Sequence, residues 1–219
     1  MIRLLIFDLD GTLFDTTPAL QEAGNEALGL LGLSPLTRAQ YAETAGGSVR
    51  GFVEAVLDRA GDPAHRFADA FWDLYLPRLM VCNRRDDANV PYPGIRELIL
   101  AARQKGVLLA VLSNKDQQSV TDLVGHFFGA ENFAITLGHS PDRPPKPDPA
   151  GIRYILETLG VANENALYVG DTEVDMETAR NAGVPAAGAV WGYRARAVLE
   201  AFHPAYLPET PFDLISALS

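Results

Sequence analysis

The sequence predicts an α/β protein in which helices cover both faces of a parallel sheet and a helical unit interrupts the chain after the first strand. Five short runs are rich in aliphatic and β-branched residues and are separated by helix-length stretches: residues 2–7, 107–112, 133–137, 166–169 and 186–190. Nearly continuous apolarity is typical of strands buried on both faces, as in parallel sheets. The alternation therefore indicates a doubly wound sheet with right-handed crossovers.

The stretches before two of these runs have the spacing of amphipathic helices. In residues 94–105, apolar side chains recur at Ile95, Leu98, Ile99 and Ala102. Residues 149–159 repeat this three-and-four spacing, which places the apolar side chains on one helical face. Each stretch precedes a predicted strand, as a crossover connection requires.

The first run does not lead directly to the second, because the chain between them is far longer than one crossover helix needs. Helical periodicity with almost no strand signal occupies residues 15–31, 36–44, 48–60 and 63–80. The polar stretch at residues 84–93 contains prolines and has the composition of a linker. We expect a small helical bundle here, with Tyr41, Phe52 and Trp72 in its core.

Length and composition exclude several classes of protein. At 219 residues the chain fits one α/β domain, or one core domain with a modest insertion. A formal net charge of −10 without any basic run argues against nucleic acid or membrane as a partner. The first residues hold too few apolar positions for a signal peptide, so we expect a cytoplasmic protein. A lone Cys82, and four histidines without paired spacing, exclude a disulfide framework and a zinc site.

Acidic residues follow two of the predicted strands in pairs. Asp8 and Asp10 come directly after the first strand, and Gly11 then permits an abrupt change of chain direction. Asp171 follows the strand at residues 166–169, and Asp175 lies about one helical turn further on. Ligands of open parallel sheets bind beyond the carboxyl ends of the strands, so both pairs point to one crevice. Simple turn formation at the first pair and helix capping at Asp171 are the alternative interpretations.

Converging carboxylates need a cation. Two unit charges about 4 Å apart repel each other by about 4 kcal/mol even at an effective dielectric constant near 20. Acidic oxygens from separate strands are the ligands that Mg²⁺ prefers, so the sequence predicts a magnesium site.

Two further strand ends or loops carry polar candidates. Lys146 is one of only three lysines, and the prolines around it would hold its backbone in place, although a lysine on a surface loop is the alternative. Ser113 follows the strand at residues 107–112, so its hydroxyl and the amide of Asn114 could reach an oxyanion in the same crevice. A serine at a strand end is also a common structural residue.

In this order, the residues resemble the four motifs of the haloacid dehalogenase-like hydrolase superfamily: DLDGT at residues 8–12, Ser113, Lys146, and GDTEVD at residues 170–175. The resemblance covers nearly the whole chain, and four motifs together are far more specific than any one of them. It implies a Rossmann-like core of residues 1–14 and 90–219. Residues 15–89 would form an α-helical cap domain inserted after the first motif.

The resemblance also implies a role for each motif residue. Asp8 would be the nucleophile that takes the phosphoryl group, and Asp10 would protonate the leaving oxygen and then activate water. Magnesium would be held by acids of the first and last motifs: Asp8, Asp10 through its backbone carbonyl, Asp171 and, as a ligand or as an anchor behind the ligands, Asp175. The phosphoryl group would be bound by residues of the first three motifs: Gly11, Thr12, Ser113, Asn114 and Lys146.

An acid at position 10 separates phosphatases from members of the superfamily that displace halide, because an alkoxide leaving group needs a proton donor. The stretch DGTLFDT and the run Ser113-Asn114-Lys115 are similar to the phosphoglycolate phosphatase subfamily. In the expected cap, Gly47 and Arg50 lie in a turn that could reach a substrate carboxylate. The alternative is a helix start capped by Ser48, with Arg50 in solvent.

The expected function is therefore Mg²⁺-dependent hydrolysis of a small phosphorylated metabolite such as phosphoglycolate. Two other functions are compatible with these residues: a β-phosphoglucomutase-like phosphomutase, and a non-catalytic phosphate-binding protein that retains the fold. For the assembly we expect a monomer or a homodimer.

Overall fold

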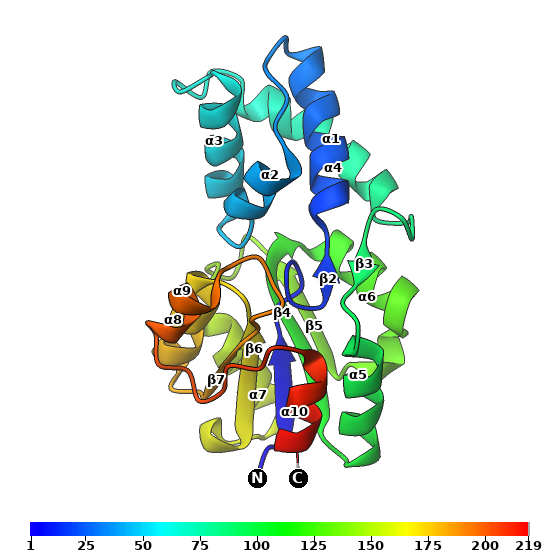
Figure 1. Cartoon of the computed structure of the whole chain (residues 1–219), viewed down its shortest axis with the longest axis vertical. Helices are drawn as coiled ribbons and strands as arrows, with labels where there is room; N and C mark the ends of the chain where they lie inside the picture. Colours follow the sequence, from blue (N-terminus) through cyan, green and yellow to red (C-terminus); the bar gives the residue numbers. More distant parts are fainter. Residues whose placement is uncertain (219) are drawn as a thin grey trace.

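A computed structural model of the chain describes residues 1–218, with a group of helices above an α/β core (Figure 1). The core sheet is parallel and has five strands in the order β5-β4-β1-β6-β7. Its strands are β1 (Leu4–Phe7), β4 (Leu108–Asp116), β5 (Ile135–His139), β6 (Ala166–Gly170) and β7 (Ala186–Gly188). Each of the five apolar runs contributes one strand, so the predicted α/β fold is confirmed.

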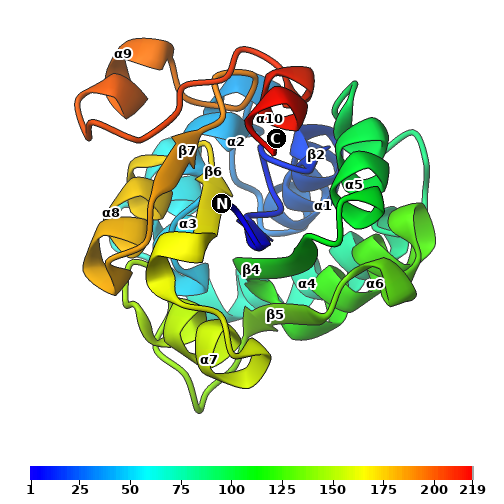
Figure 2. The same ribbon diagram turned by 90° about the horizontal axis from the view of Figure 1, so that it is seen from below.

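Helices cover both faces of this sheet (Figure 2). On one face, Leu5 and Phe7 of β1 pack against α5 (Ile95–Gln104), α6 (Gln117–Phe128) and α10 (Pro211–Ala217). On the other face, Leu4 and Ile6 pack against α7 (Ala150–Leu159) and α8 (Glu173–Ala182). Successive side chains of a strand point to opposite faces, so a fully apolar strand supplies both cores.

The strand order fixes where a ligand can bind. From β1 the chain proceeds outward to β4 and β5, and then returns to the other side of β1 for β6 and β7. The order therefore reverses between β1 and β6, and a crevice opens there beyond the carboxyl ends of the strands. The short elements η1 (Ala130–Asn132), η2 (Asn163–Asn165) and α9 (Arg196–Glu200) complete the core.

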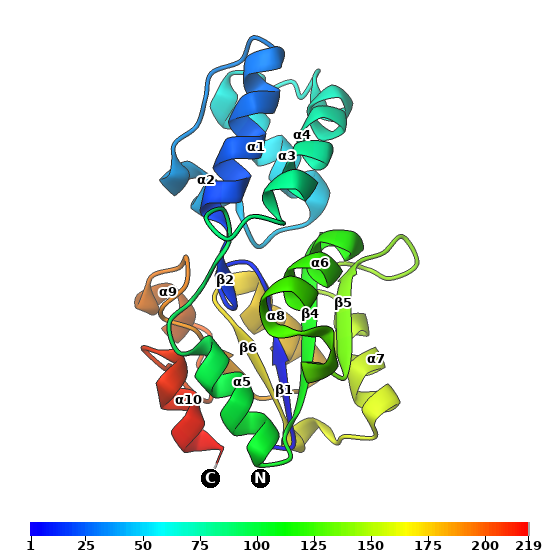
Figure 3. The same ribbon diagram turned by 90° about the vertical axis from the view of Figure 1, so that its right-hand side faces the viewer.

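The insertion after β1 consists of four helices: α1 (Thr17–Leu30), α2 (Arg38–Thr44), α3 (Val49–Ala60) and α4 (Ala68–Cys82). They share a hydrophobic core that is separate from those of the sheet and includes Tyr41, Val56 and Phe71. Figure 3 shows the helices standing over one end of the sheet. We propose that residues 15–89 are a distinct cap domain.

Two features of the insertion differ from the expectation. Helix α4 begins at Ala68, because Gly61 ends α3 in a left-handed conformation and the buried Asp62 carboxylate then accepts a hydrogen bond from the Phe67 amide. The linker also contains a strand: β3 (Val90–Pro91) pairs antiparallel with β2 (Phe14–Asp15), and this short ladder joins the two chain crossings. Within residues 1–218, no helix has the length and apolarity that crossing a membrane requires.

Candidate active site

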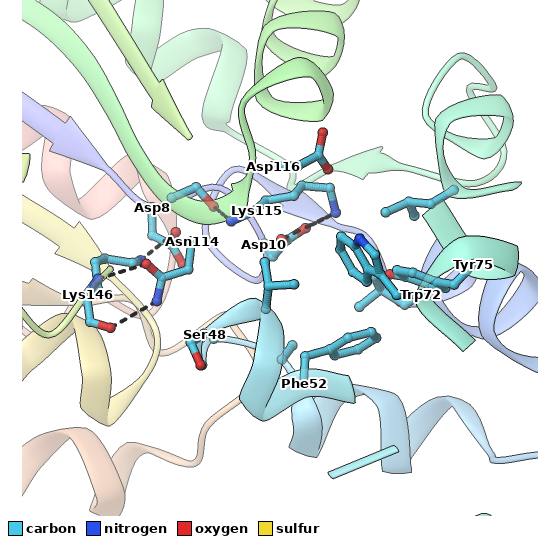
Figure 4. A pocket seen from close by; sticks show the side chains of 17 residues that line it. Asp8, Asp10, Ser48, Phe52, Trp72, Tyr75, Asn114, Lys115, Asp116 and Lys146 are labelled. Carbon is cyan, nitrogen blue, oxygen red and sulfur yellow. Dashed lines mark hydrogen bonds and ion pairs between the residues drawn. The ribbon is translucent and has the colours of Figure 1, made fainter. Parts of the chain in front are cut away.

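The crevice at the carboxyl ends of β1 and β4 contains a cavity that the inserted helices close on the side opposite the sheet (Figure 4). The core supplies its polar wall: Asp8, Asp10, Ser113, Asn114, Lys115, Asp116 and Lys146. The inserted helices and their loops supply the opposite wall: Leu20, Ala45, Gly46, Gly47, Ser48, Val49, Phe52, Trp72, Tyr75 and Leu79.

Three buried acids from the first and last motifs meet beneath this cavity. Asp8, Asp171 and Asp175 each place a carboxylate oxygen within 4.8 Å of the other two. The Asp8 amide donates to the Val169 carbonyl at 2.8 Å, which continues the pairing of β1 with β6 and brings the two strand ends together. The sequence prediction that both acidic pairs share one crevice therefore holds for these three residues.

Two loops pack tightly around the Asp171 carboxylate. It accepts hydrogen bonds from the Thr12 hydroxyl at 2.9 Å and from the Tyr193 amide at 2.8 Å. Gly11 has a φ of +84°, and a Cβ there would lie 2.3 Å from Asp171 Oδ2. A Cβ at Gly192 would lie 2.2 Å from Asp171 Cβ. Only glycine permits this approach, which leaves the carboxylate held by neutral donors.

Lys146 lies between two of the acids. Its Nζ is 2.8 Å from Asp8 Oδ1 and 2.7 Å from Asp175 Oδ1, and its side chain is 2% exposed. The Asn114 side chain fixes the lysine backbone, because its Oδ1 accepts from the Lys146 amide at 2.8 Å and its Nδ2 donates to the Lys146 carbonyl at 3.1 Å. The surface-loop alternative for Lys146 is therefore wrong.

Both carboxylate oxygens of Asp175 accept hydrogen bonds from other residues of the protein. Its Oδ2 accepts from the Thr172 amide at 3.0 Å and from the Thr172 hydroxyl at 2.7 Å, as part of the capping box that starts α8. Its Oδ1 accepts from Lys146 and from the Tyr168 hydroxyl at 3.1 Å. Of the two roles left open by the sequence, this geometry favours an anchor for Lys146 over a metal ligand.

The buried charges do not balance. Burial and the nearby Asp175 charge raise the pKa of Asp8 to about 7, although Lys146 opposes this. Burial, Asp175 and Asp8 also raise the pKa of Asp171 well above its usual range. A divalent cation between Asp8 and Asp171 would remove this cost, and hard carboxylate oxygens are the donors that Mg²⁺ prefers. The residues present therefore fit a magnesium site.

Asp10 is not one of the three clustered acids, and its side chain is 16% exposed. Lys115 Nζ is 3.1 Å from Asp10 Oδ1 and 3.4 Å from Oδ2. The pairing of β4 with β5 is irregular between Leu112 and Asp116, and irregular pairing of this kind re-aims side chains at strand ends. The four motifs give Lys115 no role, although the rarity of lysine in this chain is a usable signal.

Of the remaining candidates for binding the substrate, some line the cavity and one points elsewhere. Ser113 and Asn114 line the cavity, and Ser113 Oγ accepts from the Lys115 amide at 3.2 Å. Thr12 points its hydroxyl at Asp171. Gly47 lines the cavity from the loop between α2 and α3.

The structure does not bring Arg50 into this cavity. Its side chain is 88% exposed and donates to Glu54 Oε1 at 2.7 Å, one turn along α3. It lines a separate outer hollow. Of the three aromatic residues expected in the core of the bundle, Tyr41 is fully buried there. Phe52 and Trp72 are partly buried, pack against this core and also line the cavity.

Two tyrosines of the core also position the site, and neither is among the residues predicted from the sequence. The Tyr168 hydroxyl accepts from Lys146 Nζ at 3.2 Å, and the Tyr193 hydroxyl bonds to Thr16 at the base of α1. A tyrosine inside the buried strand at residues 166–169 is a signal for such a role, because a buried hydroxyl needs a partner.

Comparison with known proteins agrees with this geometry. A family model described as haloacid dehalogenase-like hydrolase matches residues 2–183. A relative from Aquifex aeolicus, named phosphoglycolate phosphatase, is 32% identical over 99% of this chain and 97% of its own length. A protein of the same name from Rhodospirillum rubrum is 34% identical over 88% of this chain and 81% of its own length.

Solved structures show the same architecture. A protein from Lactobacillus delbrueckii subsp. bulgaricus, assigned as a phosphoglycolate phosphatase, superposes with a TM-score of 0.87 and 28% identity over 99% of this chain and 98% of its own. A protein from Haemophilus somnus superposes with a TM-score of 0.91 and 24% identity over 100% of this chain and 98% of its own. With its four motifs assembled at one crevice, the chain belongs to the haloacid dehalogenase-like hydrolase family and is a phosphatase.

Proposed function

We propose that the protein hydrolyses the phosphate monoester of a small metabolite through an aspartyl phosphate on Asp8. The observation that carries this proposal is the buried cluster of Asp8, Asp171 and Asp175, with Lys146 between Asp8 and Asp175 and with Asp10 in the cavity wall. Phosphoryl transfer depends mainly on positioning and on positive charge, and this cluster is arranged to supply both.

In the first step a carboxylate oxygen of Asp8 attacks phosphorus, and the bond from phosphorus to the ester oxygen breaks. The proton of Asp10 passes to that oxygen, which leaves as an alcohol. Water then attacks the aspartyl phosphate, gives its proton to Asp10, and the bond to Asp8 breaks to release phosphate. Lys146 holds Asp8 Oδ1 at 2.8 Å, and within residues 1–218 no hydrogen bond engages Oδ2, so that oxygen is available for the attack.

Magnesium would be held by Asp8, Asp171 and the backbone carbonyl of Asp10, and would place positive charge against the phosphoryl oxygens. Lys146 and Ser113 would bind those oxygens from the other side of the cavity. The apolar wall above, which includes Phe52, Trp72 and Leu79, would exclude bulk water while the aspartyl phosphate exists.

Phosphoglycolate is the substrate suggested by the names of the relatives. The cavity wall contributed by the inserted helices carries no cationic side chain that could hold a second phosphate group. This absence favours a hydrolase over a phosphomutase, which must bind a bisphosphate.

Phosphate release from a panel of phosphorylated metabolites, with and without Mg²⁺, tests the proposal. We expect Mg²⁺-dependent turnover of at least one small monoester. Asp10→Asn should lose roughly 10²–10⁴ in rate, the usual contribution of general acid–base catalysis, and Asp8→Asn should lose nearly all activity. Small and equal effects of the two substitutions, or no turnover of any ester, would contradict the proposal.

A further inference from the structure

The cavity wall contributed by the inserted helices and loops, which would face the leaving group, carries no charged side chain in the part of the chain that the structure describes. Every residue that the inserted helices and loops contribute to the lining is apolar, glycine, serine or tyrosine. Arg50, the cation expected from the sequence, is exposed and paired with Glu54. An anionic group on the departing alcohol would therefore have to find its partner on the core side.

Two cations line the cavity from the core, and they differ in what holds them. Lys146 already lies between Asp8 and Asp175, at 2.8 Å and 2.7 Å. Lys115 faces a single residue, Asp10, and its side chain is only 5% exposed. An ammonium group has three N–H donors, so at least one donor of Lys115 has no acceptor among residues 1–218.

Lys115 also lies at the right place relative to the reacting atoms. Asp10 must come within hydrogen-bond distance of the ester oxygen in order to protonate it. Lys115 Nζ is 3.1 Å from Asp10 Oδ1, so with Asp10 at the ester oxygen the ammonium group would lie near the substrate carbon bonded to that ester oxygen. Figure 4 shows Lys115 reaching Asp10, with Trp72 and Tyr75 across the cavity. A carboxylate attached to the carbinol carbon would fall within reach of the ammonium group, whereas one several bonds away would meet the apolar wall.

We propose that Lys115 binds the carboxylate of the leaving group and so selects phosphate esters of 2-hydroxy carboxylic acids. The inference rests on the proposed phosphatase function and assigns a specificity-determining residue to it. The apolar wall of Phe52 and Trp72 then faces the remaining substituent on the carbinol carbon.

The experiment compares two substrates of nearly equal size, 2-phosphoglycolate and 2-hydroxyethyl phosphate, which differ in the carboxylate. We measure kcat/KM for both with the wild-type protein and with Lys115→Met. A hydrogen bond to a charged group contributes about 1.5–3 kcal/mol, which corresponds to roughly 10- to 100-fold in affinity. Lys115→Met should therefore lower the ratio of kcat/KM for phosphoglycolate over hydroxyethyl phosphate by roughly 10- to 100-fold, and Lys115→Arg should restore part of it.

Lys105→Met is the matched control, because Lys105 is exposed at the end of α5 and should leave the ratio unchanged. Lys115→Gln gives a second uncharged variant that can still donate a hydrogen bond to Asp10, so the test does not depend on one variant folding. If both uncharged variants lose activity equally on the two substrates, Lys115 only positions Asp10 and the inference is overturned. Wild-type protein that turns over both esters equally well also overturns it, whereas failure on every ester refutes the phosphatase function itself.

Discussion

Asp8 shows how one carboxylate can be required for function and costly for stability. It is buried among other acids, and this environment raises its pKa from 3.8 to about 7. Between these two values the folded protein binds more protons than the unfolded chain. The free energy of unfolding therefore falls as the pH rises through this range, and the whole cost is present above about pH 7.

This cost predicts the behaviour of Asp8→Asn without metal. Near pH 4 the variant and the wild type should have similar melting temperatures, and above pH 7 the variant should be more stable. The difference has an upper bound of about 4 kcal/mol, at 1.36 kcal/mol for each pKa unit, and each kcal/mol raises the melting temperature by roughly 2–4 °C in a domain of this size. Calorimetry in a chelator from pH 4 to pH 8 measures it, and a difference that does not grow with pH would contradict the pKa given to Asp8.

At the scale of elements, the loop between α2 and α3 approaches the core closely. Gly46 has a φ of +96°, and a Cβ at this position would lie 2.7 Å from Thr172 Cγ2, at the start of α8. A side chain here is thus opposed both by backbone strain and by a clash. The loop can close over the cavity only because this position is glycine.

Gly46→Ala should therefore displace the loop and impair catalysis without unfolding the core. We expect kcat/KM to fall by roughly 10- to 100-fold, since a displacement of about 1 Å in an active site has an effect of this order. Gly29→Ala on α1 is the control, because nothing lies within 4 Å of its added Cβ. Full activity in Gly46→Ala would show that the loop does not need this position to close.

Several elements were predictable because their signals are local. The acids at Asp8 and Asp171 follow apolar strands, and parallel strands bring their carboxyl ends together whatever the details of packing. The late start of α4 could not be predicted in the same way. It depends on the buried Asp62 carboxylate binding the Phe67 amide, and nothing in the hydrophobic periodicity of residues 63–80 reports that contact.

On the scale of the whole molecule, polar contacts join the insertion to the core near both chain crossings and at α2. Near the crossings, Thr16 bonds Tyr193, and Asp86 pairs with His126. Arg194, which follows β7, bonds Glu173 of α8 at 2.9 Å and the carbonyls of Ala42 and Ala45 at 3.0 and 3.2 Å. Asn83, after α4, donates to Ser119 Oγ of α6 at 2.7 Å. The inserted helices have a hydrophobic core of their own, which suits a cap that opens to admit substrate, as we expect from the two chain crossings.

Arg194→Ala should shift this equilibrium toward an open arrangement. We expect faster amide hydrogen exchange in α2 and in the loop that follows it, and a higher KM, because the guanidinium no longer satisfies the carbonyls of α2. Arg196→Ala is the comparison variant, since Arg196 pairs with Glu209 on the surface of the α/β core and bonds no inserted helix in the described chain. Unchanged exchange in Arg194→Ala would contradict a clamping role for this residue.

By itself, the sequence determined the sheet, the helical insertion, and the acids and lysine that meet at the carboxyl ends of the strands. Strand periodicity and strand-end position are properties of short segments. Only the tertiary structure decided which side chains of the insertion face the cavity. Arg50 points to solvent, whereas Phe52 lines the cavity. Lys115 of β4 pairs with Asp10, which lies in the loop after β1. These outcomes depend on how the helices pack over the sheet and on where the pairing of β4 with β5 becomes irregular. No local sequence pattern encodes either arrangement.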